Sequence, residues 1–202
     1  MMNSGFLKEI APVTLELNAI RLEPMNLQHK DGLHEAACDG ELWKIRVTSV
    51  PAKEETESYI LNALEGQESG HMLPFVVKEA ASGKIIGTTR YHDIIPSVAR
   101  LEIGYTWYAA SYQRTHVNTT CKLMLLRHAF DCLGARLVGW RTDNYNFRSQ
   151  RAIERLGAKL DGVIRNHLLR KDGSIRDTYM YSMTAWEWPE VEKHLSCILG
   201  LN

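Results

Sequence analysis

Residues 99–133 combine a strand-like run with a long amphipathic helix, and only a short polar loop separates the two. Apolar and polar residues alternate along Ala99–Tyr108, which predicts a strand. One face of this strand is expected to carry Leu101, Ile103, Tyr105 and Trp107. Apolar residues at helical spacing from Asn118 to Leu133 predict a helix that ends before Gly134. The segment therefore indicates a mixed α/β chain.

Further strands and helices are predicted on both sides of this segment. The expected strands are Ala19–Glu23, Leu73–Glu79, Lys84–His92, Leu137–Thr142, Leu160–Leu169 and Ile175–Met183. The expected helices are Asn26–Asp39, Lys53–Leu64, Asn146–Leu156 and Pro189–Leu199. Short polar connections at Ala81–Gly83 and Lys171–Ser174 are typical of antiparallel hairpins. We expect an α/β (α+β) fold with a largely antiparallel sheet, flanked by helices and containing one strand–helix–strand crossover.

Length and composition restrict the kinds of protein this chain can be. Its 202 residues predict a single domain, and 45% hydrophobic with 24% charged residues excludes a disordered chain. A balanced charge argues against a nucleic-acid partner, and no apolar run is long enough to span a membrane. Four cysteines and eight histidines lack metal-ligand spacing, and Cys121 and Cys132 lie in one apolar segment that is expected to belong to the core. We therefore expect a cytoplasmic protein without a metal and without a leader segment.

The balanced total conceals two regions of opposite charge. Residues 1–70 hold 6 basic and 12 acidic residues, a net charge of −6. Residues 135–176 hold 10 basic and 4 acidic residues, a net charge of +6. One region would then receive an anionic ligand while the other faces a cationic substrate; solvated helix and strand faces are the alternative.

The loop before the long helix has the properties of a phosphate site. Here Tyr112–Thr119 leads from a strand directly into a helix, which directs unpaired backbone N–H groups at one point. The sequence Gln113–Asn118 resembles the Q/R-x-x-G-x-G/A pyrophosphate loop of the GNAT superfamily of N-acetyltransferases. His116 and Asn118 stand where that family has glycines.

Two other motifs strengthen the resemblance. Residues Arg141–Ala158 look like the family's strand, Asn-x-x-Ser and Leu-Gly-Ala segment, and Glu102–Tyr105 resembles the E-I-G-Y strand of its Rim-type, ribosomal-protein N-terminal acetyltransferase branch. The resemblance covers about residues 20–183. It implies a single GNAT-like domain over 1–202 with a C-terminal extension at 184–202, and a V-shaped split in the sheet at the cofactor strand.

The resemblance also implies an activity. GNAT enzymes transfer acetyl from acetyl-coenzyme A to a primary amine by direct attack in a ternary complex, without a metal or a covalent enzyme intermediate. A lysine-like amine is almost fully protonated at pH 7, so its attack needs a base or a water relay. The expected acceptor is a small-molecule amine or a protein N-terminus, and the sequence leaves open whether the protein is a homodimer.

The resemblance assigns roles to individual residues. Glu102 is the expected base, or orients a water, and Ser149 is the expected proton donor to the leaving thiolate. The expected cofactor-binding residues are Thr106, Trp107, Tyr108, Gln113, Arg114, Thr115, His116, Val117, Asn118, Thr119, Asn146, Arg148, Ser149 and Arg151. The backbone of the first three would bind pantetheine and polarise the thioester carbonyl, and Asn146 would bond the pantetheine arm.

Alternatives stay open at several of these positions. Without its glycines the loop would suit a non-catalytic coenzyme A-binding regulatory module. Against this, first-turn helix residues have negative φ and need no glycine, and Arg114 supplies a positive charge. Glu102 would otherwise be a hydrogen-bonded strand carboxylate, and Ser149 an ordinary helix residue capped by Asn146. A nucleic-acid-binding domain is disfavoured because the basic residues are spread over several elements.

Overall fold

The computed structural model describes residues 5–201 and contains one mixed sheet in that part of the chain. The strand order is β1-β2-β3-β4-β5-β6-β8-β7, and only β5 and β6 run parallel. The bounds are β1 Leu15–Leu17, β2 Ile20–Pro24, β3 Leu73–Glu79, β4 Ile85–Ile95, β5 Arg100–Tyr108, β6 Leu137–Asp143, β7 Lys159–Leu169 and β8 Ile175–Thr184. The sheet confirms the predicted fold class. Strand β1 was not predicted.

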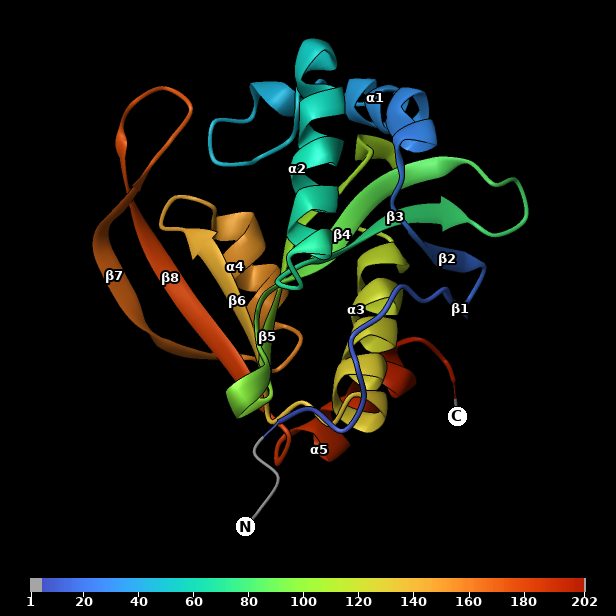
Figure 1. The fold of residues 1–202 in the computed structure, drawn as a ribbon, viewed down its shortest axis with the longest axis vertical. Helices are drawn as coiled ribbons and strands as arrows, with labels where there is room; N and C mark the ends of the chain where they lie inside the picture. The colour runs from blue at the N-terminus through green and yellow to red at the C-terminus, as the bar shows by residue number, and fades with distance from the viewer. Residues whose placement is uncertain (1–4, 202) are drawn as a thin grey trace.

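Helices cover both faces of the sheet (Figure 1). Their bounds are α1 Lys30–Cys38, α2 Thr56–Glu68, α3 Val117–Arg127, α4 Phe147–Glu154 and α5 Trp188–Ile198. A π-helical turn, His128–Cys132, continues α3 to the left-handed Gly134, as the sequence predicted for the helix end. None of the helices in residues 5–201 is long and apolar enough to cross a membrane.

Two apolar clusters lie on opposite faces of the sheet. The larger contains side chains of α3, α4 and α5 and of the strands, whereas the smaller joins α1 and α2 to Val76 and Trp107. Cys121 is buried in the larger cluster, but Cys132 is exposed, so the expectation that both cysteines belong to the core is wrong for Cys132. The reason is that Cys132 lies in the last, π-helical turn.

A β-bulge in β5 reverses the expected alternation. Thr88 pairs with Trp107 but Arg90 pairs with Gly104, so two residues of β5 oppose one of β4. Tyr105 takes a left-handed φ of 51° and is exposed. Leu101 and Ile103 therefore pack in the larger cluster while Trp107 packs in the smaller one. The prediction that Tyr105 and Trp107 share a face with Leu101 is wrong.

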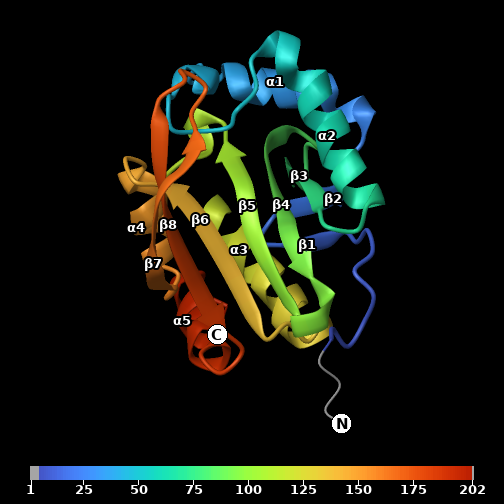
Figure 2. The same cartoon turned by 60° about the vertical axis from the view of Figure 1, so that its left-hand side comes forward.

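Strands β5 and β6 pair at one end and separate at the other (Figure 2). Their ladder covers only residues 100–102 of β5 and 137–139 of β6, although β5 continues to Tyr108 and β6 to Asp143. We call residues 100–102 the closed end of β5 and residues 104–108 its open end. The expected V-shaped split is thus present, and the open end has backbone groups on the β6 side that no strand pairs.

Candidate active site

The loop from β5 to α3 presents free backbone N–H groups next to the split. Helix α3 begins at Val117 with His116 as its N-cap, so the N–H groups of Asn118 and Thr119 have no acceptor within the helix. The Val117 N–H donates to the Thr115 hydroxyl at 3.3 Å. The side chains of Val117 and Thr119 are buried, so these two residues offer only backbone to a ligand. This is the geometry of an anion site.

The left-handed residue of the loop is Arg114, not one of the positions where the family has glycine. His116 has φ −66°, as expected at a helix start, whereas Arg114 has φ 63° and an exposed side chain. A left-handed conformation costs a non-glycine residue roughly 1–2 kcal/mol. The loop therefore forms without the glycines, at the expense of local strain, and carries a guanidinium at its tip.

Gln113 links the two sides of the split. Its Nε2 donates to the Tyr108 carbonyl at 2.8 Å, and its Oε1 accepts from Arg148 Nη2 at 2.5 Å. The Tyr108 hydroxyl in turn donates to Asn118 Oδ1 at 3.3 Å. The end of β5, the loop and the start of α4 are thereby held together.

The start of α4 lies at the end of β6. Asn146 caps the helix, because its Oδ1 accepts from the Ser149 N–H at 3.1 Å, and its Nδ2 donates to the Val47 carbonyl at 3.3 Å. The hydroxyl of Ser149 makes no hydrogen bond within residues 5–201. Arg151 donates to the Phe147 carbonyl of its own helix. Ser149 thus has a free hydroxyl, while both side-chain groups of Asn146 are engaged.

At the open end of β5 the side chains are engaged elsewhere. Trp107 and Tyr108 pack in the two apolar clusters, on opposite faces. The Thr106 hydroxyl lies 2.7 Å from both Thr89 Oγ1 and Lys122 Nζ. Any contribution of Thr106–Tyr108 to a ligand in the split therefore comes from their backbone.

Glu102 lies at the closed end and is held by arginines. Its side chain is 1% exposed, and its two oxygens accept from Arg141 Nε at 2.7 Å and Nη2 at 2.8 Å. Arg100 Nη2 donates to the same carboxylate at 3.1 Å. Burial raises the pKa of Glu102, and the charge of Arg100 opposes this shift. Because a bidentate bond needs both oxygens as acceptors, Glu102 is an ionised carboxylate.

His92 and Asp93 complete a cluster of donor atoms with Glu102, all within 4.8 Å of one another. Asp93 also pairs with Arg141. Burial, assisted by the charges of Arg141 and Arg90, lowers the pKa of His92 to about 3. The Arg141 guanidinium already supplies the cation at this point, so the donor set describes an ion-pair network and does not fit a metal centre.

Two buried cations were missed by the sequence reasoning. Arg90 is 2% exposed, and its guanidinium carbon lies 4.6 Å from the ring centroid of Tyr59 and 4.1 Å from that of Tyr105. Burial lowers the pKa of Lys122 to about 8, and its Nζ bonds only to threonine hydroxyls. Among the described residues neither cation has a carboxylate within ion-pair distance. For Lys122, its position within the apolar run of α3 could have indicated a buried cation.

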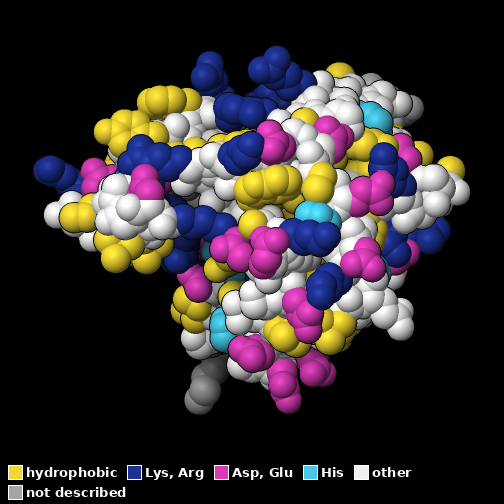
Figure 3. Space-filling model, turned by 90° about the horizontal axis from the view of Figure 1, so that it is seen from above, with side chains coloured by type: hydrophobic (Ala, Val, Ile, Leu, Met, Phe, Trp, Pro, Cys, Tyr) yellow, Lys and Arg dark blue, Asp and Glu magenta, His cyan; other side chains and the backbone are white. Residues whose placement is uncertain are grey.

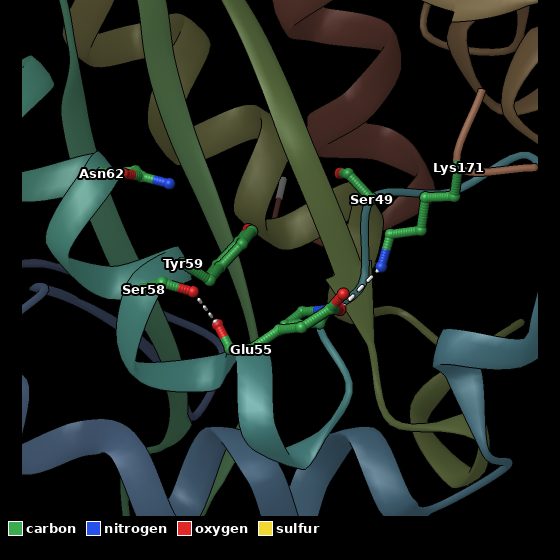
Figure 4. A pocket seen from close by; sticks show the side chains of 7 residues that line it. Ser49, Glu55, Ser58, Tyr59, Asn62 and Lys171 are labelled. Atoms are coloured by element: carbon green, nitrogen blue, oxygen red, sulfur yellow. Dashed lines mark hydrogen bonds and ion pairs between the residues drawn. The ribbon is translucent and has the colours of Figure 1, made fainter. Parts of the chain in front are cut away.

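A pocket of about 220 Å³ lies between α2 and the tip of the β7–β8 hairpin (Figure 4). Its lining residues are Ser49, Pro51, Glu55, Ser58, Tyr59, Asn62 and Lys171. Tyr59 connects it to the bulge, since its hydroxyl donates to the Tyr105 carbonyl at 3.5 Å. Lys171, at the tip of the β7–β8 hairpin, bonds Glu55 at 2.8 Å across the pocket. The pocket therefore adjoins the open end of β5.

Comparisons with known proteins agree with this geometry. The chain matches the acetyltransferase (GNAT) domain family over residues 19–159, and it belongs to that family. A GCN5-related N-acetyltransferase from Brucella melitensis is 29% identical, with 96% of this chain and 88% of that chain covered and a TM-score of 0.84. A search of curated proteins gives no match.

Two Rim-type enzymes share the fold at lower identity. Mycobacterium smegmatis RimJ, in complex with CoA-disulfide, is 20% identical, with 94% of each chain covered and a TM-score of 0.76. RimL, a ribosomal L7/L12 α-N-protein acetyltransferase in complex with coenzyme A, is 17% identical, with 85% of this chain and 98% of that chain covered and a TM-score of 0.73. The GNAT resemblance is confirmed, whereas the Rim-type branch stays a prediction.

Proposed function

We propose that this protein is an N-acetyltransferase that moves the acetyl group of acetyl-coenzyme A to a primary amine by direct attack in a ternary complex. The observation that carries the proposal is the open end of β5, which leads straight to the free N–H groups of Asn118 and Thr119. The pyrophosphate would bind those groups and Arg114, and the pantetheine arm would lie along the open strand. The complexes of RimJ with CoA-disulfide and of RimL with coenzyme A support coenzyme A as the ligand of this fold.

The residues around the split supply the groups that acetyl transfer needs. Backbone N–H groups of Thr106–Tyr108 would donate to the carbonyl oxygen as it gains charge. The free hydroxyl of Ser149, at the positive end of α4, would donate to the departing sulfur. The amine would approach from the pocket beside Tyr59. Gln113 and Arg148 would have to give up part of their present bonding as the cofactor enters.

Glu102 would take the proton of the amine through a water. Both of its oxygens already accept from Arg141, so direct contact with the acceptor would require that pair to open. His92 Nε2 lies 3.9 Å from Glu102 Oε2 and packs against the Tyr105 ring, between the carboxylate and the bulge. A water relay along this side would carry the proton to the carboxylate without direct contact between Glu102 and the amine, and the pairing with Arg141 would weaken only when the proton arrives.

A non-catalytic coenzyme A-binding module is the second candidate. The pairing of Glu102 with two arginines favours it, because both carboxylate oxygens already accept from guanidinium groups and these bonds would weaken if the carboxylate took a proton. The strained, glycine-poor loop is compatible with either activity. Cofactor binding with no turnover would identify this module.

The test measures coenzyme A binding by calorimetry and free-thiol release with acetyl-coenzyme A and a panel of amines. We expect binding and turnover by the wild type, loss of binding in Arg114→Glu, and no loss in the exposed control Arg165→Glu. Glu102→Gln should keep cofactor affinity and lower kcat/KM by about 10²- to 10⁴-fold. Absence of coenzyme A binding at millimolar concentration would contradict both candidates.

Several other expectations remain proposals. We propose one domain over 1–202, a cytoplasmic location, no resident metal and a small-molecule amine or protein N-terminus as acceptor. Gel filtration with light scattering would show whether the protein is a homodimer. The wild-type rate should persist after dialysis against a chelator.

A further inference from the structure

Two arginines beside the bulge have buried N–H groups that no described residue accepts. These groups are Nε and Nη2 of Arg90 and Nε of Arg176 on β8. Arg90 is 2% exposed and makes no ion pair within residues 5–201. An unpaired buried donor lowers stability, and more so when it is charged. These two arginines therefore suit an anionic group of a ligand.

Neighbouring side chains do not pair with these buried N–H groups. The rings of Tyr59 and Tyr105 contact the Arg90 guanidinium and its Nη1 donates to Met72 Sδ at 3.6 Å, but the N–H groups of Nε and Nη2 stay unpaired. Burial lowers the pKa of Arg176, and the charges of Asp143 and then of Tyr105 oppose this shift, so both groups lie near its guanidinium.

The carboxylates in this region are already bound to other cations. Arg141 holds Glu102 and Asp93, and Arg170 holds both oxygens of Asp143. In the adjoining pocket Lys171 holds Glu55. None of these carboxylates of residues 5–201 is left to pair with Arg90 or Arg176, so a ligand would supply the anion.

The position of the arginines assigns this anion to the acceptor and not to the cofactor. Arg90 pairs in register with Gly104, at the start of the open end and beside the pocket that Tyr59 lines. The phosphates of coenzyme A are expected at Asn118 and Thr119, beyond the far end of the open strand. The thioester carbonyl is expected between the two, at Thr106–Tyr108.

We propose, building on the function above, that the acceptor is a small amine carrying a carboxylate or phosphate group a few bonds from its nitrogen, and that Arg90 and Arg176 bind that group. On the face seen from above, several Lys and Arg side chains lie together at the upper edge, and over the rest of the face they are interspersed with Asp and Glu (Figure 3). The acidic segment was expected to face a cationic substrate, but its pocket carboxylate, Glu55, is neutralised by Lys171. An anionic acceptor fits the remaining charges better.

The test compares acceptors that differ only in this charge. Common L-amino acids are assayed against their amides, and phosphoethanolamine against ethanolamine, with spermidine as the cationic probe. The amine of an amino acid amide has a pKa of about 8 and loses its proton more easily than the amine of the free acid. A preference for the acid therefore cannot arise from a larger fraction of neutral amine. We expect kcat/KM for at least one anionic acceptor to exceed that of its neutral partner by at least ~10-fold. The acid and phosphate arms show which oxyanion the site takes.

Variants then locate the anion. Arg90→Met should lower kcat/KM for the anionic acceptor by about 10- to 100-fold, with the neutral partner and coenzyme A affinity unchanged. Arg176→Met should act in the same direction and serves as a second variant. Arg165→Met, an exposed arginine of the same hairpin, is the control. With coenzyme A present, the anionic acceptor should raise the melting temperature of the wild type and not that of Arg90→Met.

The outcomes separate this inference from the proposed function. Turnover of amides and acids at equal rates, preference for spermidine, or an equal loss for both acceptors in Arg90→Met would contradict the anionic acceptor and leave the acetyltransferase intact. Coenzyme A binding without turnover of any amine, and without a melting shift by any anionic acceptor, would contradict both.

Discussion

The closed and open ends of β5 differ in whether a buried charged side chain has a counter-charge. At the closed end Glu102 is buried, and Arg141 and Arg100 together supply its counter-charges. At the open end Lys122 and Arg90 are equally buried, but they contact threonine hydroxyls and tyrosine rings in place of carboxylates. One strand thus passes from a compensated site to an uncompensated one within a few residues.

We infer from this difference that the pairs of the closed end stabilise the fold, whereas the buried cations of the open end do not. A compensated buried pair stabilises the native state only while both partners are present. An uncompensated buried cation lowers stability whenever no ligand anion is bound. Removing one charge should therefore be harmful at the closed end and beneficial to stability at the open end.

The largest effect is expected from Arg141→Met, which removes the bidentate partner of Glu102. The free energy of unfolding should fall by about 3–5 kcal/mol, because the carboxylate would be left buried without its main counter-charge. Urea denaturation measures this. The double variant Arg141→Met, Glu102→Gln should recover much of the loss. A decrease of under ~1 kcal/mol in the single variant would show that the closed end does not depend on this pair.

A gain in stability is expected from Lys122→Met. The folded pKa of about 8, against an ordinary value of 10.5, corresponds to about 3 kcal/mol of destabilisation at neutral pH. Since the unfolded chain keeps its proton up to the higher value, wild-type stability should rise between pH 8 and 10.5. Lys122→Met should lose that rise, while the exposed control Lys53→Met keeps it. A Lys122→Met protein less stable than the wild type at pH 7 would refute the contrast.

A smaller effect, on rate alone, is expected from Ser149→Ala. Its hydroxyl has no partner in residues 5–201, and alanine suits a helix, so stability should stay within ~0.5 kcal/mol. If the hydroxyl donates to the leaving sulfur, kcat should fall by about 10-fold with coenzyme A affinity unchanged. Asn146→Ala, which removes the cap of α4, should lower both. Wild-type kcat in Ser149→Ala, with chemistry rate-limiting, would make the serine structural.

Most helices and strands could be predicted from local patterns, because each has its own periodicity of apolar residues or a residue that marks its end. The hairpin strands β3 and β4, and the helix stop at Gly134, follow from alternation and turn residues. The split was implied by the family resemblance, whereas the phosphate site was predicted from the junction at Tyr112–Thr119 together with that resemblance and stays a prediction. The bulge at Tyr105 did not follow, because a two-to-one pairing depends on the partner strand and leaves the sequence alternation unchanged.

The charge contacts of the site could not be predicted either. Glu102 was expected as a base, but its bond to Arg141 joins two residues that are 39 positions apart. The left-handed Arg114 breaks the usual preference for glycine, so no local rule identifies it. Arg90 lies in an ordinary strand alternation, and its lack of a carboxylate is visible only in three dimensions.

Hydrogen–deuterium exchange with and without coenzyme A tests the central claim most directly. The claim is that the open end of β5 and the start of α3 form the cofactor site. Coenzyme A should slow amide exchange in peptides covering residues 104–108 and 115–120, with little change at the closed end, which is already paired on both sides. Binding that leaves exchange in these two segments unchanged and protects another part of the chain would contradict the account.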